Sequence, residues 1–196
     1  MGVAAPGGWR RRALPSLRAV LGLLACLLAA DVAAADVSIV TRRRGDALEI
    51  EGRASLAVPL AVAWAVLTDY ERLPRFIPGI LASRVVSRDG ASLVLEQAGE
   101  IRVLFFSVAV EARLAVEEAP RASISSRGLS GSFRSMQGRY DLREAGGVVE
   151  FLYTGTIVPD TWLPAFIGDG VLAAHVDSQF RALVHEIARR ASTGGG

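Results

Sequence analysis

Apolar and polar residues alternate along most of this chain, as expected of strands that bury one face. The segments with this pattern are 37–43, 48–56, 81–88, 91–98, 101–116, 136–143 and 149–157. Asp89-Gly90 and Ala145-Gly146-Gly147 separate neighbouring segments and are typical turn sequences. Phe105 interrupts the alternation within 101–116, which suggests a bulge. The pattern therefore predicts an antiparallel meander.

Two parts of the chain have helical periodicity instead. Pro59 has the fixed φ that suits a first helical position. The apolar residues that follow it on one helix face are Leu60, Trp64 and Leu67. Pro74 and Pro78 end a brief second helix. Near the C-terminus, the apolar stripe of a long helix consists of Val176, Phe180, Leu183, Val184 and Ile187.

Together these elements predict an α+β fold. A curved antiparallel β-sheet grips the long C-terminal α-helix, with two short helices after the first strand. The inward positions are rich in Gly, Ala and Val, and Ala61, Ala63 and Ala65 keep the first helix slim. Small side chains leave space between a curved sheet and its helix, so we expect an internal cavity. A fully packed core is the alternative that the sequence leaves open.

The segment from Val58 to Ile80 resembles the START-like, helix-grip (SRPBCC) superfamily. The residues that carry the likeness are Thr68-Asp69-Tyr70-Glu71, Leu73-Pro74 and Phe76-Ile77-Pro78-Gly79-Ile80. Within the superfamily, the chain is similar to the polyketide cyclase/dehydrase and lipid-transport group, which includes the coenzyme Q-binding START domains. The likeness covers most of the chain, from Asp46 to Arg190. It implies a helix-grip fold with an internal site for a hydrophobic molecule, while the ligand differs between members.

Residues 1–35 have the features of a signal peptide. Four arginines precede the apolar run 19–30, which is shorter than the roughly 20 residues of a membrane-spanning helix. Ala33-Ala34-Ala35 supplies small residues for cleavage. We therefore expect a secreted, periplasmic protein. The sequence ending at Cys26 loosely resembles a lipobox, so a lipid anchor on Cys26 is the less favoured alternative.

Residues 36–196 suit one START-like ligand-binding domain with a frayed tail at 191–196. The chain has 22 basic and 20 acidic residues, and without its arginine-rich leader it is close to neutral, so no nucleic-acid partner is expected. His185-Glu186 lacks the second histidine of a zinc motif. Gly128-Leu129-Ser130-Gly131 is not a nucleophile elbow and is interpreted as a loop. We expect no metal, no cofactor and no catalytic residue.

We expect a domain that binds a hydrophobic small molecule (a lipid, an isoprenoid or a quinone-like compound) for transport or sequestration in the cell envelope. Candidate cavity residues are Trp64, Phe76, Phe106, Val108, Met136, Tyr140, Phe151, Tyr153, Phe166, Val176 and Phe180. The hydroxyls of Tyr140 and Tyr153 suit either a ligand oxygen or a neighbouring strand, and Arg134 and His175 are candidates near the mouth. A cyclase- or dehydratase-type enzyme and a ligand-free interaction module are the alternatives.

A further apolar cluster precedes the last helix. It runs from Trp162 to Ile167 and is followed by Gly168-Asp169-Gly170. Such a cluster is a candidate for transient membrane contact during ligand exchange, or for packing under the first helices.

Overall fold

The computed structural model describes residues 2, 36–103, 105–160 and 168–194. Contacts divide the chain into Met1–Asp31 and Val32–Gly196, and the described helices and strands all belong to the second unit. The predicted signal peptide apart from residue 2, with Cys26 in it, lies outside the described residues, and so does the predicted apolar cluster from Trp162 to Ile167, which includes Phe166. The elements in chain order are β1 (Asp36–Arg44), β2 (Ala47–Leu56), α2 (Leu60–Leu67), the 3-10 helix η1 (Tyr70–Arg75), β3 (Ile80–Asp89), β4 (Ser92–Val103), β5 (Phe106–Ala119), β6 (Ser123–Gly131), β7 (Phe133–Ala145), β8 (Val148–Pro159) and α3 (Asp169–Thr193).

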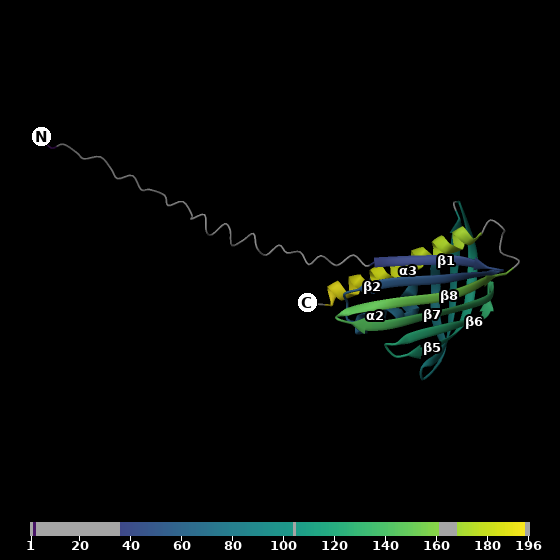
Figure 1. The fold of residues 1–196 in the computed structure, drawn as a ribbon, viewed down its shortest axis with the longest axis horizontal. Helices are drawn as coiled ribbons and strands as arrows, with labels where there is room; N and C mark the ends of the chain where they lie inside the picture. The colour runs from purple at the N-terminus through teal and green to yellow at the C-terminus, as the bar shows by residue number, and fades with distance from the viewer. Residues whose placement is uncertain (1, 3–35, 104, 161–167, 195–196) are drawn as a thin grey trace. The chain divides into compact units, whose positions relative to one another are not determined.

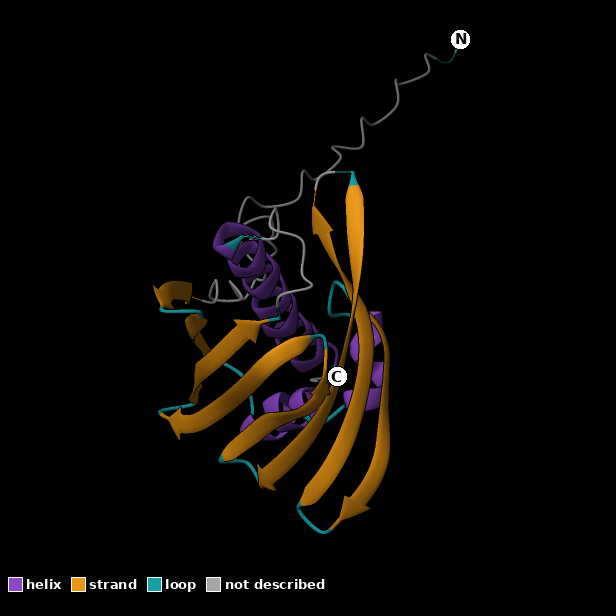
Figure 2. Cartoon of the chain, turned by 90° about the vertical axis from the view of Figure 1, so that its right-hand side faces the viewer, coloured by secondary structure: helices purple, strands orange, loops and turns teal. Residues whose placement is uncertain are grey.

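Within the described residues, eight strands form one antiparallel sheet in the order β1-β2-β8-β7-β6-β5-β4-β3 (Figure 1). Strands β3 to β8 are a meander, and β2 joins it beside β8. Because β2 and β3 are far apart in this order, the chain crosses between them through α2 and η1. The sheet curves around α3, which lies on its concave side (Figure 2). The predicted α+β helix-grip architecture is confirmed.

The first predicted strand forms and pairs with the second along its whole length, from Asp36 opposite Ser55 to Arg44 opposite Ala47. The two short helices therefore follow β2 and not the first strand of the chain. Their helical character was predicted correctly, and of the predicted apolar face of α2 only Leu67 is fully buried. Ala63, Val66 and Leu67 are its buried residues, while Leu60 and Trp64 are only partly buried.

Two segments differ from the prediction. The segment 101–116 is not one bulged strand: β4 ends at Val103, β5 begins at Phe106 opposite it, and Phe105 lies in the turn of this hairpin. The segment that contains Gly128-Leu129-Ser130-Gly131 is not a loop but part of β6, which pairs with both β5 and β7. Residues 123–127 pair with both neighbours and residues 128–131 with β5 alone, and this pairing holds the serine- and glycine-rich segment extended in spite of its weak intrinsic preference for that state.

The segment after α2 is attached to α3 and to the sheet by polar contacts. Asp69 Oδ2 accepts a hydrogen bond from Arg190 of α3 at 2.7 Å, and the Tyr70 hydroxyl donates to Glu118 Oε1 of β5 at 2.9 Å. Arg190 also donates to Glu186 at 2.7 Å. Asp69 and Tyr70 therefore act in the fold as a clamp that attaches the segment after α2 to α3 and to the sheet.

Candidate functional site

A cavity lies between the concave face of the sheet and α3. It has two adjoining parts of about 180 Å³ and about 110 Å³, and both are lined by Ile80, Gln97, Met136 and Gln179. The lining of the larger part comes from α2, η1, the six strands β3 to β8 and α3, so it exists only when the whole domain is folded. Most of the lining is apolar, with a few polar groups among it.

The structure brings some of the predicted residues to this cavity. Met136, Tyr140, Tyr153 and Val176 line it. Phe151 and Phe180 are buried in the larger hydrophobic core beside it, and Trp64 and Phe76 pack partly buried against that core. Val108 packs against a second, smaller core cluster that contains Leu172 of α3.

Phe106 does not line the cavity, and this candidate is corrected. Its side chain is 69% exposed, because it begins β5 directly after the hairpin turn at the end of the sheet. The alternation of 101–116 placed Phe106 on the same strand face as Val108 and Val110, and β5 does have these three residues on one face. The hydrophobic core, however, does not extend to Phe106, the first residue of β5. Arg134 lies on the surface, where it forms an ion pair with Asp46.

The lining residues that sequence reasoning missed include Gln97, Gln179 and Ile80, which line both parts of the cavity, and the first two had a readable signal. Gln97 follows Leu93 and Leu95 at two-residue spacing, so it is an amide on an apolar strand face. Gln179 lies four residues before Leu183 on α3 and therefore shares its face. Ile80 had no such signal, because its place depends on how the chain enters β3.

Tyr140 and Tyr153 form the aromatic centre of the cavity. They are direct cross-strand partners on β7 and β8, and their ring centroids lie 4.6 Å apart. The ring of Tyr153 lies over another cross-strand pair, Gly138 and Gly155. A Cβ atom on Gly155 would lie 2.6 Å from the Tyr153 hydroxyl oxygen, so a glycine is required at this position for the ring to lie where it does.

Both tyrosine hydroxyls are neutral donors at ordinary pH. Burial raises the pKa of Tyr153 to about 12 and raises the pKa of Tyr140 further. Within the described part of the chain, no residue forms a hydrogen bond with either hydroxyl. A hydroxyl that opens onto the cavity and has no protein partner is free to donate to a bound molecule that carries an oxygen acceptor.

His175 and Gln179 form the polar end of the smaller cavity part. The Gln179 amide nitrogen lies 3.1 Å from His175 Nε2 and donates to the Pro78 carbonyl oxygen at 3.1 Å. Burial lowers the pKa of His175, so its imidazole is neutral at ordinary pH. Gly79 has φ +79°, and a Cβ atom there would lie 2.5 Å from His175 Cε1. The loop after η1 therefore closes directly against α3.

His175, Gly79 and Ile80 line this cavity on one side and an outer groove of about 650 Å³ on the other. We call these three residues the wall.

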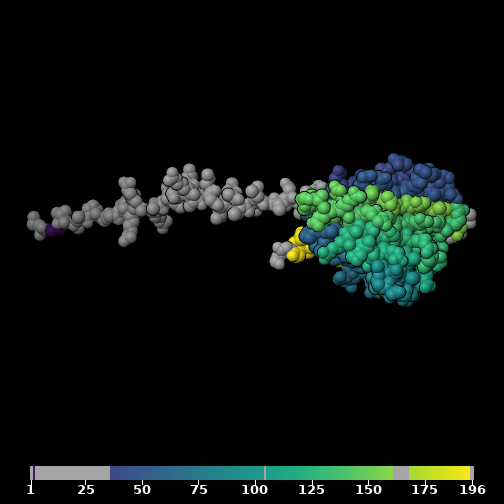
Figure 3. All heavy atoms as spheres, turned by 60° about the horizontal axis from the view of Figure 1, so that its bottom comes forward, coloured from purple at the N-terminus to yellow at the C-terminus, as the bar shows by residue number. Residues whose placement is uncertain are grey.

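A separate hollow of about 630 Å³ lies on the outer face of the sheet, and its charged lining, which includes Arg42, Glu51 and Arg139, does not suit an apolar ligand. Figure 3 shows strand side chains forming a continuous surface on one side of the domain.

The described residues contain no group of His, Cys, Asp and Glu side chains that could hold a metal ion. Across the same ranges, no helix has both the length and the apolar character to cross a membrane.

A curved sheet wrapped on one long helix, with a mostly apolar cavity between them, defines a START-like cavity protein. The chain belongs to the polyketide cyclase/dehydrase and lipid transport family, whose model matches residues 56–184. A search of the curated proteins found no match.

Solved structures share the fold at low sequence identity. TTHA0849 of Thermus thermophilus is 13% identical with a TM-score of 0.62, over 76% of this chain and 99% of its own. The Zhui aromatase/cyclase of Streptomyces sp. R1128 is 16% identical with a TM-score of 0.62, over 76% and 99%. A STAR-related lipid transfer protein of Xanthomonas axonopodis is 13% identical with a TM-score of 0.61, over 77% and 93%. At such identities, the likeness shows the fold alone.

Proposed function

We propose that the cavity binds a hydrophobic small molecule, with a lipid, an isoprenoid or a quinone-like compound as the leading class, and that the protein sequesters or transports it. The observation that carries the proposal is the pair of tyrosine hydroxyls, on Tyr140 and Tyr153, that open onto the cavity without a hydrogen-bond partner among the described residues. Apolar lining supplies affinity through burial, and a few polar groups set the orientation of the ligand. An oxygen-bearing ring or headgroup suits this combination.

The volume of the cavity supports a ligand whose head is enclosed. The two parts, of about 180 and about 110 Å³, together fall just short of the roughly 300–1,000 Å³ of small-molecule sites. A compact ring occupies such a space, whereas a long chain attached to it extends past the wall at His175 into the outer groove. This arrangement favours a molecule with a polar head and an apolar tail.

The place of action is the cell envelope in this proposal. The arginines and the apolar run of residues 1–35 support secretion to the periplasm. Attachment to a membrane of the envelope through an acylated Cys26 is the alternative to a free periplasmic protein.

An enzyme of the cyclase or dehydratase type is the second candidate function. His175 favours it, since a neutral imidazole at the inner cavity is a potential proton acceptor beside the tyrosine hydroxyls. A His175→Gln variant distinguishes the two functions: it abolishes turnover of an enzyme, whereas a carrier keeps its ligand.

The proposal is tested by calorimetric titration with two probes, a short-chain ubiquinone and a hydrocarbon of similar length without oxygen. We expect the wild-type protein to bind both, and Tyr140→Phe combined with Tyr153→Phe to weaken ubiquinone binding about tenfold while leaving the hydrocarbon unaffected. Phe keeps the ring, so the cavity retains its shape. Failure of the wild-type protein to bind either probe contradicts the proposal.

A further inference from the structure

The sheet has two edge strands among the described residues, β1 and β3, and they differ in regularity. The register of β3 with β4 shifts after Ile80 and again after Val85. Such irregularities bend an edge strand and protect it from pairing with another chain. Strand β1 has no such shift and no proline along Asp36–Arg44, and it forms one border of the sheet (Figure 1). This border, which we call the β1 edge, is therefore suited to pairing with a further strand.

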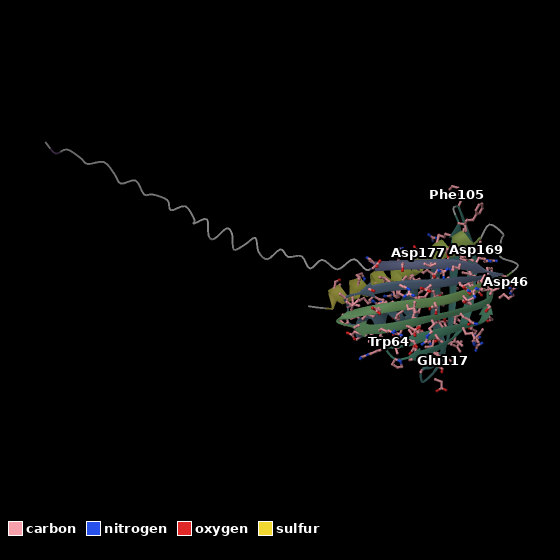
Figure 4. All side chains as sticks on the ribbon, in the orientation of Figure 1. Asp46, Trp64, Phe105, Glu117, Asp169 and Asp177 are labelled. Atoms are coloured by element: carbon pink, nitrogen blue, oxygen red, sulfur yellow. The ribbon has the colours of Figure 1, made fainter. Side chains whose placement is uncertain are left out.

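Every second residue of β1 directs its backbone N–H and C=O groups away from β2. The β1–β2 hairpin closes at Arg44 opposite Ala47, around a two-residue turn that contains Asp46 and lies at the end of the domain (Figure 4). A pair that closes such a turn is hydrogen-bonded, and bonded and non-bonded pairs alternate from there. The residues whose backbone groups face the β1 edge are therefore Val37, Ile39, Thr41 and Arg43. In the described part of the chain, no backbone–backbone hydrogen bond outside the strand ladders involves residues 36–44.

The β1 sequence is complementary to itself in the antiparallel direction. If two copies pair about Val40, all 9 residues of β1 gain a partner, and each backbone group at the edge meets another. Asp36 then faces Arg44 of the second copy, a pair of opposite charge, and Val40 faces Val40. The arginines 42–44 of the two copies lie at opposite ends of this ladder, whereas a parallel pair would bring them side by side. Like charges directly opposite destabilise a sheet, so the charges favour the antiparallel register about Val40.

The side chains of β1 keep exposed surface that such pairing would cover. Val40 is 45% exposed on the outer face, while Val37 and Ile39 are partly buried on the inner face and pack against the hydrophobic core. All three are β-branched, the type of residue that packs well across paired strands. The Arg44 side chain is 80% exposed and pairs with Glu49 at 3.1 Å, so its guanidinium retains donors for a carboxylate of the second copy. Pairing therefore buries apolar surface at the centre and adds ion pairs at the ends.

We propose that two copies of this chain pair through the β1 edge, antiparallel and with Val40 facing Val40, so that their two sheets join into one. The contact consists of one strand from each copy and is smaller than a standard stable interface, so the dimer is weak and depends on protein concentration. Strand β1 precedes residues 56–184, which the family model matches. The pairing involves neither the cavity nor its ligand, so its failure would leave the proposed function untouched.

Cysteine cross-linking tests the register directly. Cys26 is the only cysteine of the chain, so every variant also carries Cys26→Ala. In the proposed register the two Val40 residues form a non-bonded pair, in which the Cα atoms lie about 4.5 Å apart, within the range that a disulfide bridges. We expect oxidation by air, with copper phenanthroline as catalyst, to convert Val40→Cys to a covalent dimer.

Two variants serve as controls. Arg42→Cys lies on the same face of β1, but the two copies of residue 42 would be about four residues, or about 13 Å, apart along the ladder, which a disulfide cannot span. Val86→Cys lies on β3, the other edge strand, and Val86 is 40% exposed against 45% for Val40. We expect neither control to cross-link above background. Cross-linking of either control as fast as Val40→Cys, or no cross-linking of Val40→Cys, overturns the proposal.

Sedimentation velocity measures the association without a covalent bond. We expect the wild-type protein to dimerise as its concentration rises to about 1 mM. Val40→Arg should raise the dissociation constant at least about tenfold, since it places two arginines opposite each other beside Arg42. Val86→Arg should leave the dissociation constant unchanged. A wild-type protein that stays monomeric throughout, or a dimer that persists equally in Val40→Arg, overturns the proposal.

Discussion

Replacing Glu186 by Gln should destabilise the protein by about 2–3 kcal/mol at pH 7, because two arginines of α3 converge on its buried carboxylate. Glu186 is 7% exposed, and Arg189 and Arg190 each donate to it at 2.7 Å. The bond from Arg189 and then that from Arg190 lower the pKa of Glu186 from 4.5 to about 2, against the opposing effect of burial. A shift of this size corresponds to about 3 kcal/mol.

The sign of the pH dependence follows from the direction of the pKa shift. A carboxyl group with a lowered pKa in the folded state stabilises that state fully above its unfolded pKa, and the stabilisation is lost as pH falls through the folded pKa. For Glu186 this interval runs from about pH 5 to about pH 2, and roughly 2 kcal/mol is already lost at pH 3. The difference between wild type and Glu186→Gln should shrink by that amount.

Urea denaturation followed by tryptophan fluorescence measures this difference at pH 7 and at pH 3. Asp177→Asn is the matched control, because Asp177 forms an ion pair with Arg181 on the same helix while the two side chains are 38% and 54% exposed. Exposed pairs of this kind contribute about 0.3–0.5 kcal/mol. A Glu186→Gln cost that is equal at both pH values, or no larger than that of Asp177→Asn, refutes the reasoning.

Two further substitutions test the clamp and the glycine beneath the Tyr153 ring. Tyr70→Phe removes the donor to Glu118 and should cost about 1–3 kcal/mol in urea denaturation, because the carboxylate loses a partially buried partner; a cost below about 0.5 kcal/mol would contradict the clamp. Gly155→Ala places a Cβ atom 2.6 Å from the Tyr153 hydroxyl oxygen and should cost about 1–3 kcal/mol through overpacking. Gly170→Ala, with open space around it, should be neutral or stabilising in the same assay.

The fold could be predicted from the sequence because its elements carry strong local signals. The alternating segments, the turn at Asp89-Gly90 and the apolar stripe of α3 all correspond to observed elements. Strand β6 had no such signal, since its serines and glycines acquire strand geometry only by pairing with β5 and β7. The hairpin turn at Phe105 could not be predicted, because the apolar residues on both sides of it have the pattern of one continuous strand.

The candidate site was predictable only in part. Period-two alternation placed Met136 and Tyr140 on one face and Tyr153 on the facing strand, and these residues do line the cavity. The contact between the two tyrosine rings depends on the register of β7 and β8, which no local pattern specifies. The wall depends on how the loop after η1 meets α3 at His175, which is a tertiary contact between distant segments.

The most direct test of the central claim is native mass spectrometry of the protein purified from the envelope of the cells that make it, followed by organic extraction of any bound molecule. The account predicts one apolar molecule per chain that carries an oxygen acceptor, and its loss from the variant that combines Tyr140→Phe with Tyr153→Phe. A protein that is isolated empty and that takes up neither ubiquinone nor a hydrocarbon would contradict it.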